Sequence, residues 1–178
     1  MLLSLLISGC KKKTEQPKDV IDIRIESAED VLIKVWACYE DEDKFNIVGG
    51  DIDNMAMGCP CDFSLTAVSE MESMLGVPES AISMLENAAT MADEMDSFTY
   101  TVAAYSVKDS ANVTTFRETV EKTLLKKEWG EESPDKLVIA TFEGNYVIVA
   151  YGETNKIETF VDRLEYATDA KVVVNKDW

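Results

Sequence analysis

The chain contains no histidine among its 178 residues. This absence removes the side chain that most often acts as a general base near neutral pH, the commonest zinc ligand, and every catalytic triad that depends on imidazole. The Walker phosphate-binding loop, the G-x-S-x-G nucleophile motif and the G-x-G-x-x-G dinucleotide motif are also missing. The sequence therefore excludes the enzyme classes that depend on these groups, and it favours a protein without catalytic activity.

Lysine and arginine are absent from Phe45 to Val107, a segment that contains ten aspartates and glutamates. The whole chain has 17 basic and 34 acidic residues, and its formal net charge is −17. This charge argues against binding to nucleic acid or direct adsorption to anionic lipid, because both are negatively charged. The acidic segment is typical of a solvated surface that keeps a protein soluble. It would also attract a cationic peptide or a divalent metal.

Long apolar runs are scarce, and the one at the N-terminus is short. Residues 1–9 are nearly all apolar and end in small residues before Cys10, and three lysines follow. A membrane helix needs about 20 such residues, so this run is too short to span a bilayer. The arrangement predicts a secretory signal peptide over 1–9, with an unprocessed apolar N-terminus as the alternative.

The segment Ile7–Cys10 resembles the lipobox of bacterial lipoproteins. The resemblance implies that Cys10 carries a diacylglycerol thioether and that the protein is anchored to the outer face of the cell membrane. Residues 10–26 are polar and lack a hydrophobic period, which predicts a flexible tether. Residues 27–178 are long enough for a single α+β domain with its own core.

Hydrophobic periodicity predicts the order of elements in this domain. Ser27 and Asp30 form a capping-box-like start for a helix over 28–40, and 45–48 is a short strand candidate. Two or three short helices are expected between 64 and 95. The second half predicts strands at 98–107, 137–142, 146–151 and 171–174 and a helix at 113–129. Glu143-Gly144-Asn145 predicts a tight hairpin between the two middle strands. Thr154 is expected to cap a last helix, whose apolar stripe of Ile157, Phe160, Val161 and Leu164 would face the sheet.

The order β-α-β-β-α-β over about 98–175 predicts a ferredoxin-like module, in which an antiparallel sheet carries both helices on one face. The mainly helical N-terminal half is expected to pack on this module as an elaboration. The predicted fold class is therefore α+β.

The segment MAMGCPC at 55–61 is the most unusual in the chain. Inert thiols, or one disulfide from any pairing of Cys38, Cys59 and Cys61, would give these cysteines a structural role. A second interpretation is a strained redox couple of Cys59 and Cys61 in a thiol–disulfide oxidoreductase. A third is a soft Cu(I) site, and its ligands would be Met55, Met57, Cys59 and Cys61.

All seven methionines after the initiator lie between residues 55 and 95. Flexible thioethers suit grooves for apolar peptides, and these methionines share their segment with a one-signed negative charge. The same side chains would equally fill gaps where short helices pack on a sheet. An acidic, methionine-containing binding surface and a methionine-rich core are therefore both consistent with the sequence.

Three runs carry a family resemblance: FNIVGGDIDNMAMGCPCDF, LGVPESAISMLENAATMADEMDSFTYTVAAYSV and PDKLVIATFEGNYVIVAYG. They are similar to poorly characterised lipoproteins of clostridial-type Gram-positive bacteria, some of which carry the label bacteriocin transport accessory protein. The resemblance covers about Val31 to Lys176 and implies an association with peptide export. The resemblance does not identify any functional residue of this chain.

These observations together predict a non-catalytic, lipid-anchored surface protein that needs no cofactor. Its expected partners are the membrane, reached through Cys10, and a cationic peptide or an envelope protein bound at the acidic, methionine-containing surface. The alternatives are the oxidoreductase and the Cu(I)-binding protein.

Overall fold

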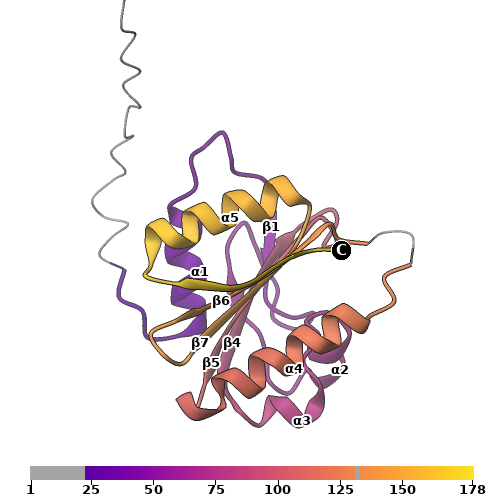
Figure 1. Ribbon diagram of the computed structural model, residues 1–178. Helices are drawn as coiled ribbons and strands as arrows, with labels where there is room; N and C mark the ends of the chain where they lie inside the picture. The colour runs from indigo at the N-terminus through magenta and orange to yellow at the C-terminus, as the bar shows by residue number, and fades with distance from the viewer. Residues whose placement is uncertain (1–22, 131–132) are drawn as a thin grey trace, which may run out of the picture.

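The computed structural model describes residues 23–130 and 133–178, and one antiparallel eight-stranded sheet runs through it (Figure 1). The predicted signal peptide, Cys10 and most of the predicted tether lie outside the described residues. The strands are β1 Ile47–Gly49, β2 Ala56–Met57, β3 Cys61–Asp62, β4 Leu85–Asp93, β5 Tyr100–Val107, β6 Lys136–Phe142, β7 Tyr146–Gly152 and β8 Lys171–Asp177. The helices are α1 Ala28–Ala37, α2 Val68–Ser73, α3 Glu79–Ile82, α4 Val113–Lys126 and α5 Thr154–Ala167, with a 3₁₀ turn at Ser110–Asn112.

The strands lie in the order β2-β1-β4-β5-β7-β6-β8, and β3 pairs with β4 beside β1. Every pairing is antiparallel. The central strands β5, β6 and β7 are buried at nearly every position, so the sheet needs an apolar layer on both faces.

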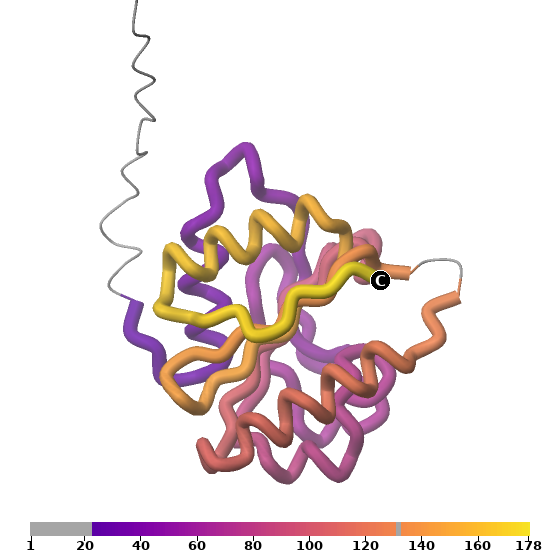
Figure 2. Tube along the Cα trace, in the orientation of Figure 1, coloured from indigo at the N-terminus to yellow at the C-terminus, as the bar shows by residue number. Residues whose placement is uncertain are grey.

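The two faces are covered by different helices. On one face, α1 and α5 enclose a core around Leu32, Tyr100 and Phe160. Figure 2 shows that these two helices, from opposite ends of the described chain, lie side by side. On the other face, α2, α3 and α4 enclose a core around Tyr105 and Phe116. None of the helices in the described residues is long and apolar enough to cross a membrane.

Local sequence signals account for several elements. The Ser27 side chain accepts the Asp30 N–H while the Asp30 carboxylate accepts the Ser27 N–H, which confirms the capping box, and the helix ends at Ala37, three residues before the predicted end. The predicted hairpin between β6 and β7 is confirmed, because Glu143 and Gly144 both adopt positive φ at its turn. The strand predicted at 45–48 appears as β1.

The prediction of a mainly helical N-terminal half is wrong at residues 85–93. This stretch, LENAATMAD, contains good helix formers, yet it is strand β4. It lies between β5 on one side and β1 and β3 on the other, and both of its faces are buried. Burial in the sheet therefore outweighs the helix propensity of alanine and methionine.

The ferredoxin-like module expected for 98–175 is not confirmed. Its element order is present, from β5 through α4, β6, β7 and α5 to β8. The expectation that both helices share a face is wrong, because α4 packs with α2 and α3 whereas α5 packs with α1 on the opposite face. The last strand pairs with β6 at the edge of the sheet. The physical reason is that β5, β6 and β7 are apolar on both faces, so each face needs a helix.

Candidate functional site

A row of cross-strand neighbours forms the floor of a groove on the face that carries α2, α3 and α4. Register places Val48 of β1 opposite Ala92 of β4, and Ala92 opposite Thr101 of β5. Cross-strand partners share a face, so their side chains point the same way, and Thr90 lies beside them. Met57 of β2 pairs with Val48 and continues the row to the edge of the sheet.

The walls of this groove are rich in exposed apolar side chains. They come from the loop after β1, from α2 and its C-terminal end, and from the loop after β4. The cavity has a volume of about 450 Å³. We call it the Met groove, and its principal wall residues are Ile52, Met55, Glu70, Met74, Glu94 and Met95.

Tyr151 fixes the boundary between the groove and the covered part of the sheet. Its hydroxyl donates to the backbone carbonyl of Met74 at 2.7 Å, directly after the end of α2. Tyr151 is also the cross-strand neighbour of Thr101 in the floor. Burial raises the pKa of Tyr151 to about 12, so the phenol stays protonated and remains a donor at neutral pH. This contact ties the Met74 wall to the sheet.

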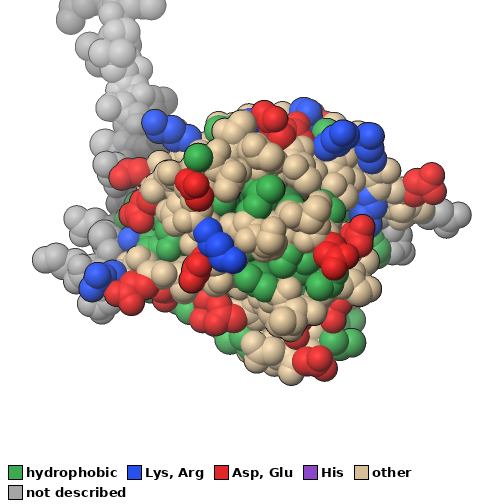
Figure 3. Space-filling model, turned by 90° about the horizontal axis from the view of Figure 1, so that it is seen from below, with side chains coloured by type: hydrophobic (Ala, Val, Ile, Leu, Met, Phe, Trp, Pro, Cys, Tyr) green, Lys and Arg blue, Asp and Glu red, His purple; other side chains and the backbone are tan. Residues whose placement is uncertain are grey.

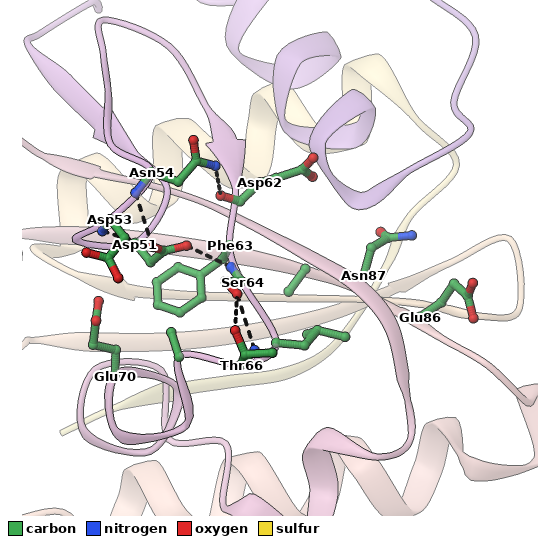
Figure 4. Close-up of a pocket in the computed structure, with 13 residues that line it drawn as sticks. Asp51, Asp53, Asn54, Asp62, Phe63, Ser64, Thr66, Glu70, Glu86 and Asn87 are labelled. Atoms are coloured by element: carbon green, nitrogen blue, oxygen red, sulfur yellow. Dashed lines mark hydrogen bonds between the residues drawn. The ribbon is translucent and has the colours of Figure 1, made fainter.

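The loop after β1 is held over the floor by its own polar groups. The Asp51 carboxylate accepts the backbone N–H groups of Asp53, Asn54 and Ser64, and Asp51 is only 4% exposed (Figure 4). The Thr90 hydroxyl accepts the Gly50 N–H at 3.0 Å and donates to the Gly50 carbonyl at 3.2 Å. Asp51 is therefore committed to the shape of the loop and is not available as a ligand group.

The loop after β4 is held by Asp93. Its carboxylate accepts the N–H of Met95 at 2.9 Å and an N–H from the Lys156 ammonium at 3.0 Å. Burial alone would raise the pKa of Asp93, but the hydrogen bonds from Lys156 and from the Met95 N–H outweigh it, so the pKa is lowered. Met95, at the tip of this loop, is 86% exposed.

A second cavity of about 500 Å³ adjoins the Met groove, and Phe63 lies in the lining of both. Figure 4 shows its polar lining. We call it the acidic cleft. Its carboxylates are Asp51, Asp53, Asp62, Glu70 and Glu86.

Negative charge is concentrated around these two cavities. None of the described residues that line either of them is lysine or arginine. Nearby, burial and the carboxylates of Asp62 and Asp30 raise the pKa of Glu29. By contrast, the face seen from below, which carries α3 and α4, shows acidic and basic side chains interspersed with hydrophobic ones (Figure 3). Within the described residues no group of three or more acidic or cysteine side chains is arranged to hold a metal ion.

The structure shows Cys59 and Cys61 as thiols, and none of the three predicted pairings is present in the part of the chain that it describes. Cys59 is exposed, Cys61 is half-buried, and Cys38 is buried at the C-terminal end of α1. Burial and the carboxylates of Glu29 and Asp62 raise the pKa of Cys61. A raised pKa lowers the thiolate fraction at neutral pH, which makes Cys61 a weaker nucleophile.

The two thiols of the predicted copper site make separate contacts. The Cys59 thiol lies 3.8 Å from the Met57 carbonyl, whereas the Cys61 sulfur lies 3.7 Å from the side-chain amide of Asn54. Met55 and Met57 are each 58% exposed, and Met55 lines the Met groove.

The methionines divide between the two roles that the sequence left open. Met71 and Met91 are fully buried and fill the cores on opposite faces of the sheet. The exposed methionines are Met55, Met57, Met74 and Met95, and they lie in or beside the Met groove.

Sequence reasoning missed the floor of the groove and the tyrosine that bounds it. The sequence predicts a helix at Thr90. A helix prediction conceals the alternation of a strand, in which Thr90 points to the groove face and Met91 points to the core on the opposite face. The strand that contains Thr101 is predicted at 98–107 and observed at Tyr100–Val107, and a threonine inside this mostly apolar strand is the signal for a polar position in the sheet.

Comparison with models of known families, with curated proteins and with solved structures finds no significant match to this chain.

Proposed function

We propose that this protein is a non-catalytic binding protein whose Met groove accepts a cationic peptide segment that carries apolar side chains. The observation that supports this most directly is the groove itself. It joins exposed methionines, an apolar floor and acidic residues, and its described lining contains no positive charge. Methionine side chains adapt to ligands of different shape, so the groove suits a family of segments rather than one rigid ligand.

The floor favours apolar contact over polar recognition. The hydroxyl of Thr90 already donates to the Gly50 carbonyl, and that of Thr101 donates to the Ser97 carbonyl at 2.8 Å. Both hydroxyls therefore donate to backbone within the protein and do not offer a proton to a ligand. An apolar side chain of the ligand would be buried there at about 25 cal/mol per Å² of apolar surface removed from water.

The rim supplies the charge. Asp51 and Asp93 are used within the protein, as described above, but the exposed side chains of Glu94, Asp53 and Glu86 face solvent at the groove and the adjoining cleft. Lysine or arginine in the ligand would pair with them. Pairs between exposed charges are weak and screened by salt, so the rim contributes more to the rate of association than to affinity.

The proposal includes the location expected from the sequence. A lipid on Cys10 would hold the domain at the outer face of the membrane through the tether at residues 10–26, and the groove would meet exported peptides or envelope proteins there. We do not extend the proposal to oxidoreductase or copper chemistry. The raised pKa of Cys61 does not favour a reactive thiolate, and the Cys59 and Cys61 thiols make separate contacts.

Fluorescence anisotropy with labelled peptides tests the proposal. A peptide of alternating lysine and leucine should bind the full chain and lose affinity as salt rises, whereas a glutamate–leucine peptide of equal length should not bind. Glu94→Lys and Met95→Lys should weaken binding several-fold. The matched control is Glu165→Lys, an exposed position on α5 on the opposite face of the sheet. Equal effects of Glu94→Lys and Glu165→Lys would show that net charge alone drives binding, and the groove would be rejected as the site.

A further inference from the structure

Solvent exposure sorts the methionines by their position in the fold. Met71 and Met91 are completely buried in the two cores. The methionines with the largest exposed fractions lie in or beside the Met groove: Met95 at 86%, Met55 and Met57 at 58% and Met74 at 37%. A dissolved oxidant would therefore reach the thioethers of the groove before it reached those of the cores.

Thioethers react with hydrogen peroxide by oxygen transfer. A lone pair of the methionine sulfur attacks one peroxide oxygen, the O–O bond breaks, and an S–O bond forms while the second oxygen leaves as water. The sulfur loses two electrons and the peroxide gains them, so the products are methionine sulfoxide and water. The reaction requires no catalytic group from the protein, and exposure therefore decides which methionines react first.

The groove is poorly suited to hold a sulfoxide beneath a bound ligand. A sulfoxide oxygen is a hydrogen-bond acceptor, and covering it without a donor costs free energy. The Thr90 and Thr101 hydroxyls donate to backbone carbonyls, which leaves Ser97 as the one other side-chain donor among the described lining residues. The carboxylates of Glu70 and Glu94 in the walls are acceptors and would repel the new oxygen. Oxidation would therefore replace apolar wall surface with polar groups that lack donors.

The fold itself does not depend on the exposed thioethers. Met55 and Met95 lie on loops that are held by other groups. Asp51 and Thr90 fix the loop after β1, and the Asp93 carboxylate fixes the loop after β4 through a backbone N–H. Because the two core methionines are inaccessible, the domain is expected to stay folded while the groove changes.

We propose that Met55, Met74 and Met95 are oxidation sites, and that their conversion to sulfoxides by hydrogen peroxide stops peptide binding in the Met groove. This inference rests on the function proposed above, because it concerns the regulation of the same groove. Methionine oxidation is reversible, and reduction of the sulfoxides returns the apolar walls. Peptide binding by this protein thus depends on the peroxide level around it.

Peroxide treatment of the full chain, followed by peptide mapping and fluorescence anisotropy, tests the proposal. Among the exposed methionines, mass spectrometry should find sulfoxide first at Met95 and last at Met74, with the two core methionines unmodified. The dissociation constant for the lysine–leucine peptide should rise on the order of tenfold, while thermal unfolding shows that the treated chain is folded. Methionine sulfoxide reductases that act on both epimers should restore binding.

The triple variant Met55→Leu/Met74→Leu/Met95→Leu separates oxidation from shape. Leucine keeps an apolar side chain of similar volume and cannot form a sulfoxide, so this variant should bind the peptide both before and after treatment. Met84→Leu is the matched control, because Met84 is half-buried against the core that α2, α3 and α4 enclose and does not line the groove. It should lose affinity on treatment as the unmodified chain does. Loss of affinity in the triple variant as well would overturn the proposal.

The thiols need a control of their own, because peroxide also oxidises cysteine. Cys59→Ser/Cys61→Ser should lose affinity on treatment to the same extent as the unmodified chain. The proposal is overturned if this variant keeps its affinity, if treatment unfolds the domain, or if a chain that carries the sulfoxides binds as tightly as before. An untreated chain that binds no peptide would instead reject the proposed function itself, and the regulation inferred from it.

Discussion

One face of the sheet has a covered end and an open end, although the same strands form both. At the covered end, Tyr105 of β5 is fully buried under α4, with its ring 5.1 Å from that of Phe116. At the open end, four residues earlier on the same strand, Thr101 lies in the floor of the Met groove. Among the described residues that line the groove, none belongs to a helix lying above this floor, and the loops and α2 form only its walls.

The two ends differ in side-chain size and in how their polar groups are satisfied. Large rings fill the covered end, and the Tyr105 hydroxyl has no hydrogen-bond partner among the described residues, so packing alone stabilises that position. Small side chains leave space at the open end, and the hydroxyls of Thr90 and Thr101 are bonded to nearby backbone. The open end can therefore meet solvent or a ligand without leaving buried polar groups unpaired.

The largest effect is expected from breaking the covered end. Phe116→Ala removes a fully buried ring and leaves a cavity against Tyr105, and it should lower the free energy of unfolding by about 3–5 kcal/mol. Urea denaturation measures the change, and Thr114→Ala on the exposed side of α4 is the control. A loss below about 1 kcal/mol would show that this end is not the tightly packed core described here.

A smaller but still large effect is expected at the loop over the open end. Gly50 has φ of +89°, and a Cβ there would clash with the Asn54 carbonyl oxygen. Gly50→Ala should therefore cost more than the roughly 1–2 kcal/mol of a left-handed alanine, and it should weaken peptide binding because the loop forms a wall of the groove. Gly58→Ala is a matched control, with φ of +77° and nothing within 4 Å of the added carbon. Equal losses of stability for the two variants would contradict the proposed clash.

The boundary between the ends can be loosened at Tyr151. Tyr151→Phe removes the hydrogen bond to the Met74 carbonyl and should cost about 0.5–1.5 kcal/mol in unfolding free energy. Because Met74 is part of the wall, peptide affinity should fall as well. Tyr166→Phe, at a half-exposed position on α5, provides the control. Unchanged affinity in Tyr151→Phe would mean that the Met74 wall does not depend on this bond.

The smallest effect is a pH dependence at the open end. The pKa of Asp93 is lower in the folded protein than its ordinary value, so its contribution to stability is present above about pH 4 and is lost as pH falls through the folded pKa. Asp93→Asn should reduce the loss of unfolding free energy that occurs as pH falls on the acid side. Above pH 5, the unfolding free energies of the variant and of the unmodified chain should change with pH in parallel. Thermal unfolding between pH 2.5 and pH 7, with Asp162→Asn on α5 as the control, measures this difference. Identical acid profiles for Asp93→Asn and the unmodified chain would refute the assignment.

Predictions from sequence were most accurate where one local signal sufficed. The capping box at Ser27, the hairpin turn at Glu143–Gly144 and the apolar stripe of α5 each depend on neighbouring residues, and each appears as predicted. The strand β4 was missed because its residues favour a helix locally and only their burial between neighbouring strands makes them extended. Among the candidate site residues, Met55 lies in the groove wall, but the methionine pattern alone did not separate it from the buried Met71.

The sequence by itself determined the negative charge, the absence of histidine chemistry, the cluster of methionines and most elements of the second half. These properties follow from composition and from contacts between residues close together in the chain. Only the tertiary structure decided that α4 and α5 lie on opposite faces, that Thr101 and Ala92 become neighbours, and that some methionines are core while others line a groove. The physical reason is that strand register and the burial of both faces of a sheet depend on contacts between residues far apart in sequence, which no local pattern encodes.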